Sequence, residues 1–103
     1  MEIKIPKQIK IAGRTYTIKF SKNIIRDDGD RGTVCYGTQI IELYDRLEKE
    51  QLAVTFLHEY IHAVEQHLCG REIISEATTC GLSEGIYQLL DNFGIEFSWE
   101  DIK

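Results

Sequence analysis

The residues best suited to chemistry are His58-Glu59-Tyr60-Ile61-His62, which form an H-E-x-x-H run. On a helix, residues four apart lie on one face with Cβ atoms about 5–6 Å apart. Both imidazoles can therefore reach one zinc ion, at about 2.0–2.1 Å. Glu59 projects beside them, where it can act on a metal-activated water as general base without ligating the ion. The alternative is two histidines satisfied by hydrogen bonds in the core.

A catalytic zinc site also needs a third protein ligand and an open position. Glu76 follows His62 by fourteen residues, enough for a helix to finish, turn and return. We expect Glu76 to be this ligand, while Cys80 and Glu84 stay open as alternatives. Cys80 could instead act as a fourth ligand and close a purely structural zinc site.

One long helix must position the H-E-x-x-H run. Between Asp45 and Gly70 there is no Gly or Pro, and apolar residues recur with helical spacing at Leu52, Phe56, Leu57, Ile61, Val64 and Leu68. Asp45 and Glu48 resemble a capping box, and Gly70 is expected to be the left-handed C-cap. His67, about 140° round this helix from His62, is predicted to be solvated.

A second helix is predicted from Ser75, its N-cap, to Gly94. Its apolar side includes Leu82, Ile86, Leu89 and Leu90. Because glycine lets backbones approach closely, Gly81 and Gly85 are interpreted as the place where this helix crosses the first.

The first half of the chain reads as strands. Apolar residues alternate from Ile9 to Phe20 around Gly13, which predicts a hairpin, and residues 33–36 and 39–43 predict a second pair. Residues 27–30 are predicted to be a solvated acidic turn, and residues 95–103 irregular structure. The expected fold is therefore α+β: a small antiparallel sheet of about four strands packed against two main helices, in a single domain, 1–103.

Composition limits the classes of partner. The chain has 103 residues, of which 43% are hydrophobic and 28% charged, and its formal net charge is −5. This charge repels phosphate backbones, so nucleic acid is not expected as a partner. With no apolar run of about 18 residues and no signal-like start, a cytoplasmic location without membrane contact is expected. Cys35, Cys69 and Cys80 are expected to be free, buried thiols.

Two segments, TFLHEYIHAV and EATTCGLSEGIYQLLDNFG, extend this reading. Between Gly32 and Gly94 the chain resembles the small gluzincin-type metallopeptidase-like proteins related to the ImmA/IrrE group, many of them encoded by phages and prophages. The resemblance implies a minimal zincin-like core with His58, His62 and Glu76 as zinc ligands and Glu59 as general base. It also implies that the hairpin around Gly37 supplies the strand above the site.

The leading functional hypothesis is a zinc-dependent peptide hydrolase whose peptide or protein substrate pairs with an edge strand near Thr38 to Leu43. The alternative is a catalytically inert zincin-fold binding module of phage or prophage origin. The sequence leaves the substrate, the oligomeric state and the group that stabilises an oxyanion open.

Overall fold

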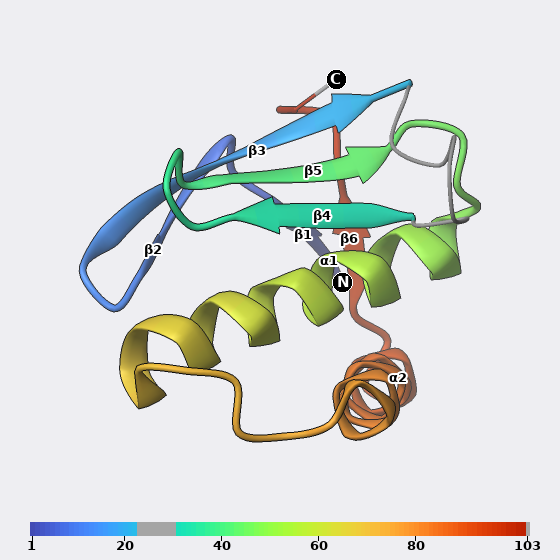
Figure 1. The fold of residues 1–103 in the computed structure, drawn as a ribbon. Coiled ribbons are helices and arrows are strands. Elements are labelled where there is room, and N and C mark those ends of the chain that lie inside the picture. Colours follow the sequence, from blue (N-terminus) through green and yellow to red (C-terminus); the bar gives the residue numbers. More distant parts are fainter. Residues whose placement is uncertain (23–30, 103) are drawn as a thin grey trace.

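The structure is a computed structural model that describes residues 1–22 and 31–102 (Figure 1). Its main sheet has the strand order β2-β3-β5-β4. The bounds of these strands are β2 Gln8–Ile11, β3 Arg14–Ser21, β4 Gly32–Cys35 and β5 Ile40–Tyr44. The helical segments are α1 Lys49–Val64, the π-helical η2 Glu65–Cys69 and α2 Glu76–Asn92. The α+β fold class is thus confirmed, while the acidic turn at 27–30 lies outside the described residues.

Two short connections build the sheet. Ala12 and Gly13 both have positive φ, 52° and 79°, as the tight primed turn of a two-residue hairpin requires. The predicted hairpin is therefore confirmed as β2 and β3, which pair antiparallel. The second predicted pair is β4 and β5, also antiparallel. The sheet has the four strands expected, but it is mixed and not wholly antiparallel as predicted, because β5 pairs with β3 in parallel.

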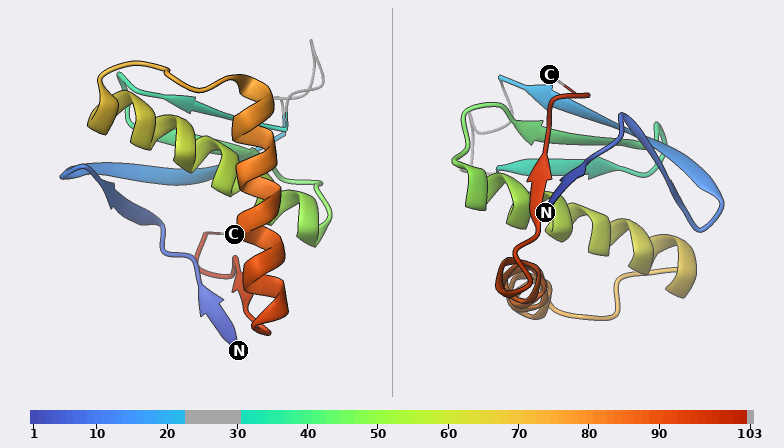
Figure 2. Two further views of the ribbon diagram at one scale, coloured as in Figure 1. Left: turned by 90° about the horizontal axis from the view of Figure 1, so that it is seen from below. Right: turned by 180° about the vertical axis from the view of Figure 1, so that it is seen from behind.

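The molecule is layered (Figures 1 and 2). α1 lies along one face of the sheet, and α2 crosses α1 on the side away from the sheet. The core lies between the sheet and α1, and its largest contributors from the strands are fully buried: Ile11, Tyr16, Ile18, Ile41 and Leu43. Leu52, Phe56 and Ala63 cover them from α1. This packing fixes which face of α1 remains for the H-E-x-x-H run.

The start of the helical segment differs from the prediction, whereas its C-cap agrees with it. The helix begins at Lys49 after Glu48, which makes no side-chain cap, so the predicted capping box on Asp45 is wrong. The backbone N–H of Asp45 instead donates to the carbonyl of Ser21 at 3.1 Å, which ties it to the end of β3. At the other end η2 continues the helix, and Gly70 is its left-handed C-cap, with φ 79°, as predicted.

α2 turns a small polar face inward. Thr79 and Ser83 are fully buried, whereas Leu82 and Leu89 are 46% and 51% exposed. Both buried hydroxyls donate to carbonyls one turn earlier in their own chain, at 3.2 and 2.7 Å, so burial leaves neither unpaired. A Cβ built on either helical glycine, Gly81 or Gly85, would meet nothing within 4 Å. The interpretation of these glycines as the helix crossing is therefore wrong.

The segment after α2 is more regular than expected. Residues Glu96–Ser98 form β6, which pairs in parallel with β1, Glu2–Lys4. The prediction of irregular structure is wrong for these three residues. The three cysteines are free, as expected, but all are exposed rather than buried. Within residues 1–22 and 31–102, no helix combines the length and the apolar character needed to cross a membrane.

Candidate metal centre

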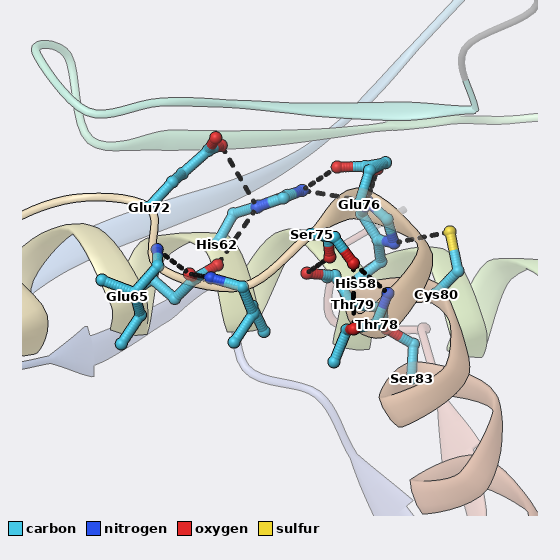
Figure 3. Close-up of polar contacts among 12 residues, drawn as sticks. His58, His62, Glu65, Glu72, Ser75, Glu76, Thr78, Thr79, Cys80 and Ser83 are labelled. Atoms are coloured by element: carbon cyan, nitrogen blue, oxygen red, sulfur yellow. Dashed lines mark hydrogen bonds and ion pairs between the residues drawn. The ribbon is translucent and has the colours of Figure 1, made fainter.

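Two helices bring the predicted ligands together (Figure 3). α1 carries His58 and His62 on one face, and Glu76 is the first residue of α2 because Ser75 caps that helix, accepting from the backbone N–H of Thr78 at 3.1 Å. One carboxylate oxygen of Glu76 lies 2.6 Å from Nε2 of His58. The other lies 3.2 Å from Nε2 of His62. The two Nε2 atoms are 3.0 Å apart.

These separations suit a shared metal ion. Ligand atoms about 2.0–2.1 Å from a tetrahedral zinc ion lie roughly 3.3 Å from one another, close to the distances between the two Nε2 atoms and the Glu76 oxygens. Imidazole nitrogen and carboxylate oxygen are both zinc ligands. Among the described residues, His58, Glu76 and Cys80 also form a group whose ligand atoms all lie within 4.8 Å. The chain therefore has a His, Glu and Cys group that could hold a metal ion.

Cys80 approaches the opposite side of the imidazole. Its Sγ lies 3.8 Å from Nδ1 of His58, whereas Nε2 of His58 faces Glu76 and His62. When Nε2 binds a metal ion, Nδ1 carries a proton, which a sulfur atom can accept. The geometry at this contact is that of an outer hydrogen-bond partner of His58.

A cavity of about 420 Å³ joins the site to the sheet. Its floor is α1, where His58, Glu59 and His62 line it, and its facing wall is the start of β4. Glu59 is 8% exposed, so its carboxylate lies at the cavity but is mostly shielded from water. Glu84 is exposed and lines the same cavity from α2. Glu59 therefore lines the same cavity as His58, His62 and Glu76, between α1 and β4.

The edge of the sheet at this cavity is β4. In the described part of the chain β4 pairs only with β5, which is itself interior, so the expectation of an edge strand near Thr38 to Leu43 is wrong. The backbone N–H of Tyr44 donates to the carbonyl of Arg31 at 2.8 Å. Because hydrogen-bonded pairs alternate along antiparallel strands, the backbone groups of Gly32 and Val34 point away from β5. No other strand among residues 1–22 and 31–102 pairs with this side of β4.

Glu65 is a site residue that the sequence reading did not select. Its Oε2 accepts backbone N–H bonds from Ile73 at 2.8 Å and Ile74 at 3.0 Å, which hold the pKa of this carboxyl below its usual range. Its Oε1 lies 3.7 Å from Nδ1 of His62. The available signal was its position three residues after His62, where side chains on a helix are neighbours.

The prediction that His67 is solvated surface is wrong, because the residue is partly buried and contacts the sheet. Its ring packs edge-on against Tyr16 and Tyr36, its Nε2 bonds the Tyr16 hydroxyl, and its Nδ1 accepts from Arg14 at 3.1 Å. Burial, and secondarily the Arg14 charge, lower the pKa of His67. His67 therefore ties η2 to the β2–β3 hairpin and lies outside the candidate site.

The similarity comparisons give no relative. No protein-family model matches this chain, and neither a curated protein nor a solved structure matches it. The functional argument consequently rests on the geometry of the site.

Proposed function

We propose that this chain is a zinc-dependent peptide hydrolase, related to the gluzincin-type ImmA/IrrE group that its sequence resembles. His58, His62 and Glu76 would hold the ion. The observation that carries the proposal is the convergence of two Nε2 atoms and one carboxylate, with 2.6–3.2 Å between the contacting atoms, at a cavity that Glu59 also lines.

Zinc, when bound, would polarise the scissile carbonyl and make water a stronger acid. Glu59 would take the proton from the attacking water and deliver it to the leaving amine. Glu59 follows His58 directly on the same helix and is 8% exposed as a residue, so it would work in a shielded, low-dielectric position. The side chain of Glu76 is 66% exposed, which leaves the centre open to solvent and substrate on that side.

The substrate class follows from the sheet edge. An extended peptide can add to β4 as a further strand through the backbone groups of Gly32 and Val34. The start of β4 and His58 line one cavity, so a peptide bound there would lie beside the centre. We therefore propose peptides in extended conformation as substrates.

A structural zinc site is the second candidate, and the nearness of Cys80 favours it. The His58, Glu76 and Cys80 atoms within 4.8 Å of one another, joined by His62, would supply four protein ligands and leave no open position. The two candidates differ in what metal removal does. A chelator would silence a hydrolase and leave it folded, whereas it would unfold a protein that a structural ion stabilises.

The test has two steps. Metal content is measured on the wild type and on His58→Ala after dialysis against metal-free buffer, with one zinc per wild-type chain expected. The zinc-loaded wild type and Glu59→Gln are then incubated with a proteome-derived peptide library, and new termini are counted by mass spectrometry. Glu59→Gln should retain zinc while cleavage falls about 10²–10⁴-fold.

Each contrary outcome has its own meaning. A folded wild type that binds no zinc would overturn the metal centre. A zinc-loaded wild type that leaves the library intact would support a catalytically inert binding module instead. Equal cleavage by Glu59→Gln and the wild type would remove Glu59 from the reaction.

A further inference from the structure

We infer that Glu65 is the positioning residue of this centre: its buried carboxylate holds the imidazole of His62 and, with its other oxygen, the loop that leads to Glu76. The inference rests on the proposed zinc site. It assigns to Glu65 a role that the H-E-x-x-H run and Glu76 do not contain.

Two buried atoms carry the first step. Nδ1 of His62 and Oε1 of Glu65 each have no hydrogen-bond partner within the described part of the chain, although both atoms are buried. They face each other at 3.7 Å. Leaving a buried polar atom unpaired is unfavourable, and a shift of less than 1 Å would bring the two atoms within hydrogen-bond distance and satisfy both.

The direction of the His62 ring carries the second step. Nε2 of His62 faces Glu76 and His58, so Nε2 is the atom that would bind the ion. The ring proton then resides on Nδ1 and must be donated outward, which fixes the tautomer and the ring orientation. An acceptor is therefore required on the Glu65 side of the ring.

Two carboxylates compete for this proton, and burial distinguishes them. Oε1 of Glu72 also lies 3.7 Å from Nδ1 of His62, but the Glu72 side chain is 64% exposed. The Glu65 side chain is 6% exposed. Because two backbone N–H groups fix Glu65 and water competes for Glu72, Glu65 is the acceptor that can hold the ring in place.

The same carboxylate also acts on the other helix. Its Oε2 accepts from Ile73 and Ile74, the last residues before the Ser75 cap of α2. Glu65 thus contacts both the His62 ring and the segment that delivers Glu76. One side chain connects ligands that lie on two different helices.

The experiment compares Glu65→Gln with Glu72→Gln as its matched control. A glutamine at 65 keeps an acceptor for the Ile73 and Ile74 amides, but it turns an NH₂ group towards the proton on Nδ1 of His62. Zinc affinity is measured by competition with a chromophoric chelator. We expect Glu65→Gln to weaken zinc binding about 10–100-fold, and Glu72→Gln less than about 3-fold.

A second readout separates positioning from folding. In the zinc-loaded wild type, the Nδ1 proton of His62 should give a slowly exchanging NMR resonance that persists in Glu72→Gln and is lost in Glu65→Gln. This readout on the wild type stands even if Glu65→Gln folds poorly, and metal-free melting curves of the three proteins report folding directly.

The outcomes distinguish the two proposals. If the wild type binds no zinc, the proposed function fails and this inference fails with it. If the wild type binds zinc and Glu65→Gln binds it equally well, Glu65 has no positioning role, while the metal centre stands. If Glu72→Gln binds zinc more weakly than the wild type while the zinc affinity of Glu65→Gln is unchanged, Glu72 holds the positioning role.

Discussion

Gly32 in β4 packs directly against Thr55 in α1: a Cβ built on Gly32 would lie 2.6 Å from Cγ2 of Thr55. That separation is shorter than side-chain contacts allow, so only glycine permits the edge strand to come this close to the helix. Both residues line the cavity of the candidate centre. Their contact therefore sets the width of the cleft between β4 and the H-E-x-x-H helix.

Gly32→Ala should destabilise the fold by about 1–3 kcal/mol, because the added methyl overpacks this contact. Thr55→Ser removes Cγ2 and keeps the hydroxyl, so the double variant should recover part of the loss. Urea denaturation of the wild type, both single variants and the double variant measures the coupling. Additive effects would mean that Thr55 is not what limits the approach of β4.

Loss of an outer hydrogen-bond partner is expected to weaken zinc binding up to about 100-fold. Glu76→Gln should weaken it more than that, because it removes a charged ligand. Cys80→Ser should cost less than Glu76→Gln, since Cys80 contacts Nδ1 of His58 rather than Nε2. Glu84→Gln is the control on the same helix. Chelator competition measures all three, and a loss in Cys80→Ser equal to that in Glu76→Gln would make Cys80 a ligand.

The burial of His67, together with the nearby Arg14 charge, predicts a pH dependence of stability. Its folded-state pKa is lowered from 6.5, so below about pH 6.5 the unfolded chain binds more protons than the folded one. The free energy of unfolding of metal-free protein should therefore fall as the pH drops from 7.5 to 5.5. The groups facing His67 are Arg14, Tyr16 and Tyr36.

His67→Gln is the matched variant for that measurement, because it removes the titrating group and keeps polar atoms near Arg14. Its stability should be lower at pH 7.5 and should depend less on pH. An unchanged pH dependence in His67→Gln would assign the effect to other groups.

Substitutions on the two faces of α2 should change stability by very different amounts. Leu89→Gln should change the free energy of unfolding by no more than about 0.5 kcal/mol, because Leu89 is 51% exposed. Ser83→Leu should cost about 1–3 kcal/mol or more, because Ser83 is fully buried. Denaturant titration compares the two. A large loss in Leu89→Gln would mean that another surface covers this side of α2.

Local patterns in the sequence predicted the fold class well. Alternation around Gly13 predicted the first hairpin, and apolar spacing predicted α1, because both signals depend on residues near one another in the chain. The face of α2 was not predictable in this way. Periodicity reveals an apolar stripe, but which face is buried depends on how closely α1 and α2 approach, and this contact accepts only small side chains such as Thr79 and Ser83.

In the candidate centre, too, local spacing predicted some residues and not others. His58 and His62 follow from spacing four apart on one helix, whereas the position of Glu76 depends on a turn between two helices. His67 lies in η2, whose π-helical bonding changes the rotation per residue, so the angle counted on an α-helix misplaces it. The edge strand was assigned wrongly because the parallel pairing of β5 with β3 is a long-range contact.

The pairing of β6 with β1 bears on how the cleft can move. α2 is fastened at both ends: at its start by the two backbone bonds of Glu65, and after its end by β6, which pairs with β1 and carries Glu96, 2.7 Å from Lys49 of α1. A helix that is held at one end only can swing as a lid, whereas α2 is held at both ends where it crosses α1. Widening the cleft from the α2 side would require breaking both fastenings, so in the proposed hydrolase a peptide would enter and leave along the edge of β4.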